Sequence, residues 1–200
     1  MIFVLLGLGC ETVGTTLAPW VPALEQVDPT WGEEPVDCDM SPENRESPAN
    51  IDPTVCYSKK IRCKPGERFI IEGTSIGGRK NFDDDFWQNS ECTPQRERYD
   101  KAPEAVYLLE MPKHTEAEFR FKSNCADLAP FAFVWDGDSK ECPTNSQKPC
   151  EMWPLKSDGT RSQWMRVNAI NNPLNYLIGV DGLRGQQGNF RLTVICHKYF

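Results

Sequence analysis

The chain has 200 residues, enough for one domain of ordinary size with a tail. Its 29 Asp and Glu outnumber its 22 Lys and Arg, giving a formal net charge of −7, and the basic residues are interspersed with acidic ones. Because a phosphate backbone is bound by a clustered basic surface, this composition excludes nucleic acid as an expected partner.

Cysteine usage separates one residue from eight others. The chain has nine cysteines, no C-x-x-C pair and only two histidines, His114 and His197, which excludes zinc and iron–sulfur sites of ordinary spacing. Cys10 lies directly behind an apolar run, whereas the others are spread through polar, turn-rich sequence and predict four disulfides. Such bridges persist in the bacterial periplasm or at the cell surface. The disulfide candidates are Cys38, Cys56, Cys63, Cys92, Cys125, Cys142, Cys150 and Cys196.

The N-terminus predicts a signal peptide over residues 1–9. Ile2 to Leu8 is an apolar run of seven residues, far short of the roughly 20 needed to span a bilayer, and it ends at Gly9-Cys10. The stretch from Leu5 to Cys10 resembles a bacterial lipoprotein signal, which implies cleavage before Cys10 and lipid attachment to it. We therefore expect a cell-envelope protein anchored by its lipid to a membrane facing the periplasm or the cell surface. The alternative is a secreted protein with a spare thiol at Cys10.

Residues 10–61 predict a tether. Seven prolines recur between Glu11 and Ile61 among acidic and small residues, and hydrophobic periodicity is weak. Cys38 and Cys56 fall inside this segment, where a local loop closed between them would order its second half against the body of the protein.

Residues 62–200 predict one disulfide-stapled domain. Residues 117–122, 164–169 and 190–194 alternate between the two sides of a strand, and shorter apolar runs occur at 69–71, 106–109, 131–135 and 176–180. Turn-rich sequence separates them, so we expect an all-β fold, an antiparallel β-sandwich or jelly roll of about seven or eight strands. The turn-rich connection 181–189 predicts that 176–180 and 190–194 form a hairpin.

Three disulfide pairings are expected within this framework. Cys142 and Cys150 flank a short loop that contains proline, which brings them close. Cys38 with Cys56 is the second expected pair. Cys63 with Cys196 is the third and would tie the first strand of the domain to the last.

Several stretches occur in a characteristic order from Cys63 to Cys196. They are Cys63, residues 69–78, Cys92, residues 102–107, residues 131–135, Cys142 with Cys150, residues 175–182 and residues 188–194. This order resembles a bacterial pre-peptidase C-terminal (PPC) domain. The resemblance implies a non-catalytic β-sandwich module of a secreted bacterial protein, and some members of that family bind extracellular polymers or calcium.

A serine motif raises the question of catalysis. Residues 73–77 match G-x-S-x-G around Ser75, but a loop follows where a nucleophile elbow needs a helix. With His114 and His197 as the sole histidine bases, we read the glycines as a strand-ending turn and expect no enzyme activity.

Acidic and aromatic loop residues are the candidate ligand-binding groups. Calcium prefers clustered oxygen ligands, and the candidates are Asp83, Asp84, Asp85, Asp136 and Asp138. Glu104 and Asp181 offer further carboxylate oxygens, and several of these acids lie at expected strand ends. Trp87 and Trp153 lie in expected loops, where each ring either packs under its loop or faces a partner. No cofactor is required by these patterns, and calcium is a possible ligand.

The sequence as a whole predicts a cell-envelope lipoprotein that carries a ligand-binding or scaffold β-sandwich. Its expected partners are the membrane, through the lipid on Cys10, and a protein or an extracellular polymer. One alternative is a small secreted hydrolase. Another is a structural subunit of a larger envelope assembly, whose mark would be a wide exposed apolar face.

Overall fold

The computed structural model describes residues 35–41, 55–82, 86, 102–135, 142–143, 156–157 and 162–200. By its contacts the chain divides into Met1–Trp31 and Gly32–Phe200, and every described residue belongs to the second part. Among the described residues, no helix is long and apolar enough to cross a membrane.

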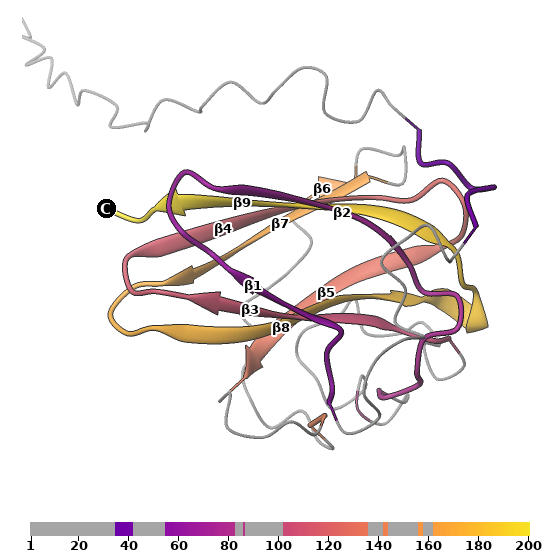
Figure 1. The fold of residues 1–200 in the computed structure, drawn as a ribbon, viewed down its shortest axis with the longest axis horizontal. Coiled ribbons are helices and arrows are strands. Elements are labelled where there is room, and N and C mark those ends of the chain that lie inside the picture. The colour runs from indigo at the N-terminus through magenta and orange to yellow at the C-terminus, as the bar shows by residue number, and fades with distance from the viewer. Residues whose placement is uncertain are drawn as a thin grey trace, which may run out of the picture. The chain divides into compact units, whose positions relative to one another are not determined.

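Nine strands form two sheets in the described part of the chain (Figure 1). The four-stranded sheet has the order β1-β3-β8-β5, and the five-stranded sheet has the order β2-β9-β4-β7-β6. The expected all-β, sandwich-like fold is confirmed, with β6 as a two-residue strand. The strands are β1 Lys59–Arg62, β2 Arg68–Thr74, β3 Ala105–Met111, β4 Thr115–Lys122, β5 Leu128–Trp135, β6 Lys156–Ser157, β7 Ser162–Ala169, β8 Leu174–Gly182 and β9 Asn189–Lys198.

The expected hairpin between residues 176–180 and 190–194 is wrong. β8 pairs with β3 and β5 in one sheet, and β9 pairs with β2 and β4 in the other. The connection between them contains the short 3₁₀ helix Leu183–Gly185 and has room to cross from one sheet to the other, whereas a two-residue turn would force adjacent pairing. All strand pairs are antiparallel except β1 with β3, which is parallel.

One apolar core fills the space between the sheets. Phe119, Phe121 and Leu192 of the five-stranded sheet are at most 1% exposed, and they belong to the same cluster as Tyr107 and Ile178 of the four-stranded sheet. These residues occupy alternate positions because successive side chains of a strand point to opposite faces. Burial of each such side chain stabilises the fold by about 1.5–3 kcal/mol.

A second apolar cluster covers the outer face of the four-stranded sheet. Phe82, from the segment after β2, lies edge-on to Phe131 and Phe133 of β5, with ring centroids 5.6 and 5.5 Å apart. Val106 and Leu108 of β3 are buried in the same cluster. Because this sheet is covered on both faces, β3, β5 and β8 have continuous apolar runs and lack the alternation seen in β4.

Three disulfides join the described cysteines: Cys38–Cys125, Cys56–Cys142 and Cys63–Cys196. The expected pairing of Cys63 with Cys196 is confirmed. The other two expected pairings, Cys142 with Cys150 and Cys38 with Cys56, are wrong. Each observed bridge joins cysteines at least 86 residues apart, so sequence proximity was a poor guide to the partners.

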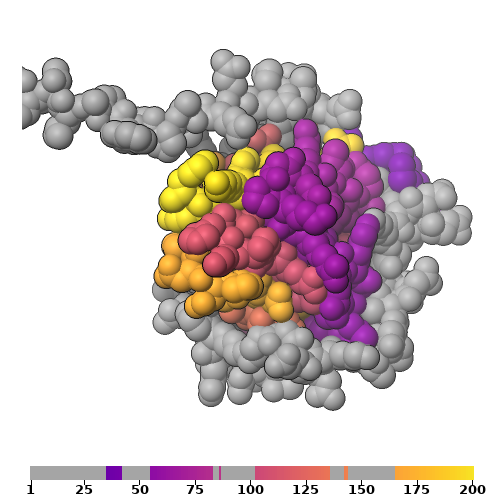
Figure 2. Space-filling view, turned by 60° about the vertical axis from the view of Figure 1, so that its left-hand side comes forward, coloured from indigo at the N-terminus to yellow at the C-terminus, as the bar shows by residue number. Residues whose placement is uncertain are grey.

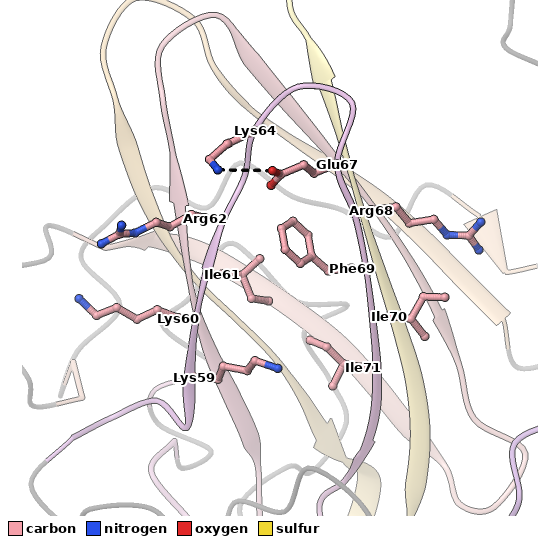
Figure 3. A pocket seen from close by; sticks show the side chains of 10 residues that line it. All are labelled: Lys59, Lys60, Ile61, Arg62, Lys64, Glu67, Arg68, Phe69, Ile70 and Ile71. Carbon is pink, nitrogen blue, oxygen red and sulfur yellow. Dashed lines mark ion pairs between the residues drawn. The ribbon is translucent and has the colours of Figure 1, made fainter.

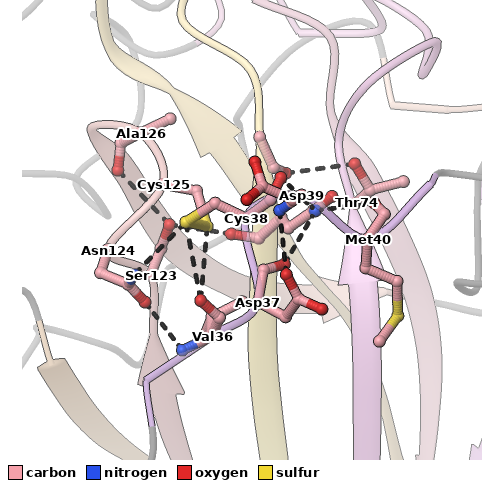
Figure 4. Close-up of a disulfide and its surroundings, with 12 residues drawn as sticks. Val36, Asp37, Cys38, Asp39, Met40, Thr74, Ser123, Asn124, Cys125 and Ala126 are labelled. Atoms are coloured by element: carbon pink, nitrogen blue, oxygen red, sulfur yellow. Dashed lines mark hydrogen bonds between the residues drawn. A yellow bond between two sulfur atoms is a disulfide. The ribbon is translucent and has the colours of Figure 1, made fainter.

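The Cys38–Cys125 bridge shows why proximity failed (Figure 4). The Val36 N–H donates to Oδ1 of Asn124 over 2.8 Å, and the side-chain amide of Asn189 lies 3.2 Å from the carbonyl oxygen of Cys38. These long-range hydrogen bonds dock part of the expected tether beside Cys125. Cys56 is likewise buried, within the outer apolar cluster that Cys142 contacts. β1 starts at Lys59, three residues before the expected domain boundary at residue 62.

Candidate functional site

Many of the residues to which the sequence assigns a lipidation, disulfide or ligand-binding role lie outside the described residues. The calcium and aromatic predictions therefore stay predictions. This group comprises Cys10, Asp83, Asp84, Asp85, Trp87, Cys92, Asp136, Asp138, Cys150 and Trp153.

Glu104 and Asp181 are among the described residues, and both carboxylates accept hydrogen bonds from backbone N–H groups. Glu104 accepts hydrogen bonds from the N–H groups of Asn81 and Phe82 over 2.7 and 2.9 Å, and Asp181 accepts one from Gly182 over 2.6 Å. Burial raises the pKa of Glu104 to about 7, although these amide hydrogen bonds oppose the increase. Among the described residues, no group of three or more His, Cys, Asp and Glu is arranged to hold a metal ion. Glu104 therefore anchors the segment that carries Phe82 onto the outer apolar cluster.

Ser75 and the two histidines lie at opposite ends of the five-stranded sheet. Ser75 directly follows β2, whose last residue pairs with Asn189, while His197 lies near the other end of β9. Eight strand positions separate Asn189 from His197, which is roughly 26 Å. His114 is at the His197 end, because Tyr199 donates its N–H to the His114 carbonyl oxygen over 2.8 Å. A serine hydrolase built from Ser75 and either histidine would need hydrogen-bond contact that this separation precludes.

The Ser75 hydroxyl has a structural role instead. Ser75 is fully buried, its N–H donates to the Gly188 carbonyl oxygen over 3.0 Å, and its Oγ accepts from the Gly188 N–H over 3.1 Å. The reciprocal pair extends the β2–β9 ladder by one residue, in agreement with the expected turn at the end of a strand.

The described surface contains a pocket of about 670 Å³ between β1 and β2 (Figure 3). β1 is an edge strand of the four-stranded sheet and β2 is an edge strand of the five-stranded sheet. The pocket therefore lies between the edges of two different sheets. The turn between the strands closes one end: Gly66, at φ 90°, donates its N–H to the Cys196 carbonyl oxygen over 2.7 Å, and Cys63 is bonded to Cys196. We call this pocket the β1–β2 groove.

The floor of the β1–β2 groove is apolar. Ile61 of β1 and Phe69 and Ile71 of β2 point into the space between the two strands (Figure 3). Ile61 and Ile71 are buried and belong to the central core, and Phe69 is half-buried against it. These residues share one side of each strand because of the two-residue period.

The rim of the β1–β2 groove is basic. Among its ten lining residues, five are cationic and Glu67 alone is anionic. Lys64 pairs with Glu67 at 3.5 Å, and Glu110 of β3 pairs with both Lys60 and Arg62, at 3.4 and 2.9 Å. Five cationic side chains and one anionic side chain therefore line the groove, in a chain whose net charge is −7. The basic lining residues are Lys59, Lys60, Arg62, Lys64 and Arg68.

The ion pair between Lys60 and Glu110 favours the charged form of each group. The hydrogen bond with Glu110 raises the pKa of Lys60, while burial, which would raise the pKa of Glu110, is outweighed by hydrogen bonds from Arg62 and Lys60 that lower it. Segment 55–82 forms an exposed part of the molecular surface beside the C-terminal strand (Figure 2). The groove is thus a solvent-accessible basic site with an apolar floor.

The basic residues of the groove form a cluster in the sequence that did not lead to a predicted site. Residues 59–68 hold five of the 22 basic residues, a local cluster that the interpretation of scattered charge overlooked. The pairing of β1 and β2 with different sheets, which makes a groove of this segment, was not predicted.

Comparisons with family models, curated proteins and solved structures give no match for this chain. The described part is therefore defined by its own architecture: an all-β, sandwich-like domain, linked by disulfides, with a basic groove between two edge strands.

Proposed function

We propose that this protein is a cell-envelope lipoprotein whose β-sandwich is a non-catalytic binding module, and that the β1–β2 groove is its binding surface. The observation that carries the proposal is a lining of five cationic side chains and one anionic side chain over an apolar floor, in an acidic protein. Such a local inversion of charge concentrates anionic ligands and speeds their encounter with the site.

Three long-range disulfides support export to an oxidising compartment. They also support a scaffold role for the domain, because each joins distant segments, and Cys63–Cys196 lies beside the turn that closes the groove. Lipid attachment at Cys10 and the relationship to PPC domains belong to the proposal, and a two-sheet all-β fold is what that relationship would require.

Two rival functions make different demands. A small hydrolase would need another nucleophile or a carboxylate pair, since Ser75 is buried and lies roughly 26 Å from His197 along the sheet. A purely structural envelope subunit would bind through an apolar face, whereas a basic groove favours an anionic ligand.

The binding proposal is tested with two anionic probes on the purified full-length chain. One is a synthetic peptide of alternating Glu and Val, and the other is dextran sulfate. We expect at least one to bind the wild type, with an affinity that falls as salt rises from 20 to 300 mM. Charge reversal of Lys59 and Lys64 together should weaken binding tenfold or more. If neither probe binds at 20 mM salt, the groove is not the binding surface.

The anchoring proposal is tested by fractionation. Wild-type protein should be found with membranes and carry acyl mass at its N-terminus, whereas Cys10→Ser should be soluble. A mature form that retains residues 1–9 would contradict it.

A further inference from the structure

The register of β2 on β9 determines which backbone groups of β2 face the groove. The Cys196 N–H donates to the Glu67 carbonyl oxygen over 2.9 Å, and the Ser75 N–H donates to the Gly188 carbonyl oxygen over 3.0 Å. In an antiparallel pair every second residue bonds to the neighbouring strand, so odd-numbered residues from Glu67 to Ser75 face β9. Ile70 therefore directs its N–H and carbonyl oxygen away from β9, toward the edge of the sheet.

Ile70 also has an unusual side chain for an edge strand. It is 55% exposed, one of three large apolar side chains that are exposed in the described part of the chain. Edge strands are commonly protected from pairing by charges, prolines or bulges, because their backbone groups can template another strand. At Ile70, β2 instead offers an exposed apolar side chain and regular extended backbone.

The two sides of an added strand would meet different surfaces. Alternate side chains of an extended segment point to opposite faces, so one set would face the apolar floor formed by Ile61, Phe69 and Ile71. The other set would lie on the outside, near the basic rim to which Arg68 contributes. A segment with alternating apolar and acidic residues complements both surfaces.

We propose that the β1–β2 groove binds an extended acidic segment of a partner protein, which adds to β2 as a further strand. This inference rests on the proposed function of the groove and names its ligand class. A backbone edge and an apolar floor favour a polypeptide over an anionic polysaccharide, because a sugar polymer offers neither strand hydrogen bonds nor alternating apolar side chains. The basic rim selects acidic segments and increases their rate of association.

The peptide probes test this inference directly. Fluorescence anisotropy with the full-length chain should show binding of the alternating Glu–Val peptide, and an alternating Lys–Val peptide should bind at least tenfold more weakly. A Glu–Val peptide N-methylated at alternate residues keeps its charge but loses strand donors, and it should also bind at least tenfold more weakly. Equal binding of the methylated and unmethylated peptides would overturn strand addition.

Variants at Ile70 separate backbone from side-chain contributions. Ile70→Pro removes the N–H that faces the edge, a position where proline is tolerated in strands, and should weaken peptide binding about fivefold to tenfold. Ile70→Ala keeps the N–H and should retain more of the affinity. If Ile70→Pro lowers the melting temperature, the comparison of the N-methylated and unmethylated peptides on the wild-type protein still tests strand addition. Equal affinities of the two variants would contradict the inference.

A control variant outside the groove and the comparison with dextran sulfate complete the experiment. Arg184→Glu reverses one charge at an exposed position that does not line the groove, and it should leave peptide affinity within twofold of wild type, whereas reversal of Lys59 alone should weaken it further. If dextran sulfate binds and the Glu–Val peptide does not, the inference fails while the proposed function stands. If neither binds, both fail.

Discussion

Cys63, which directly follows β1, is bonded to Cys196 of β9, with their Cα atoms 5.6 Å apart. The bridge joins an edge of the four-stranded sheet to an interior strand of the five-stranded sheet. Both cysteines are 1% exposed, and the Gly66 N–H bonds to the Cys196 carbonyl oxygen beside them. The cross-link and the turn that closes the β1–β2 groove therefore form one unit.

Removal of this bridge should destabilise both the fold and the groove. The double variant Cys63→Ala/Cys196→Ala should lower the free energy of unfolding by about 2–5 kcal/mol, because the disulfide closes a long loop in the unfolded chain. Urea denaturation of wild type and variant under non-reducing conditions measures the change. A loss below about 1 kcal/mol would show that the remaining bridges already restrict the unfolded chain.

The Asn189 side chain should determine how firmly the segment around Cys38 is docked. Its amide nitrogen lies 3.1, 3.2 and 3.1 Å from the carbonyl oxygens of Asp37, Cys38 and Met40. Asn189→Ala should cost about 1–3 kcal/mol through these unmade hydrogen bonds. Hydrogen exchange of residues 36–40 should accelerate while exchange in β4 stays slow. Unchanged exchange in that segment would mean that the Cys38–Cys125 bridge holds it alone.

Glu104 should make stability depend on pH in a defined window. Its pKa is raised from 4.5 in the unfolded chain to about 7 in the fold, so folding disfavours the ionised form. The contribution of Glu104 to the free energy of unfolding should be largest below pH 4.5 and fall, by on the order of 3 kcal/mol, as pH rises to about 7. Melting experiments across this range measure the slope.

A glutamine variant isolates that contribution. Glu104→Gln cannot ionise and should flatten the slope between pH 4.5 and 7, while losing about 1–3 kcal/mol at pH 5 because its NH₂ group faces a backbone donor. Glu67→Gln, at an exposed carboxylate on the groove rim, is the matched control and should keep the slope. An identical slope in Glu104→Gln and wild type would assign the effect to other groups.

The cysteine inventory predicts a fourth disulfide. Six of the eight candidates are paired, which leaves Cys92 and Cys150 as partners and Cys10 for the lipid. Non-reducing peptide mapping of protein purified from the envelope should find a Cys92–Cys150 peptide and no thiol that reacts with maleimide. Alkylation of either cysteine without reduction would contradict this pairing.

Ser75 should contribute to stability and not to catalysis. Ser75→Ala leaves the Gly188 N–H without its side-chain acceptor, which should cost about 1–3 kcal/mol. Serine-directed fluorophosphonate probes should label neither wild type nor variant. Labelling of the wild type alone would restore the hydrolase interpretation.

The amino-acid pattern predicted the strands well because alternation is a local property. Residues 117–122 and 190–194 alternate in polarity, and they form parts of β4 and β9, which are packed on one face. The disulfide framework implied by eight dispersed cysteines also needed only counting, and three bridges are present among the described residues.

Tertiary structure alone decided the partners. Residues 176–180 and 190–194 are neighbours in sequence but belong to different sheets, because a strand can satisfy its backbone with any neighbour that also buries its apolar face. Cys38 reaches Cys125 since Asn124 and Asn189 bind the segment around it, which sequence spacing does not encode. The basic residues of the groove are close in sequence. The groove itself forms because β1 and β2 lie at the edges of different sheets, which only the tertiary structure determines.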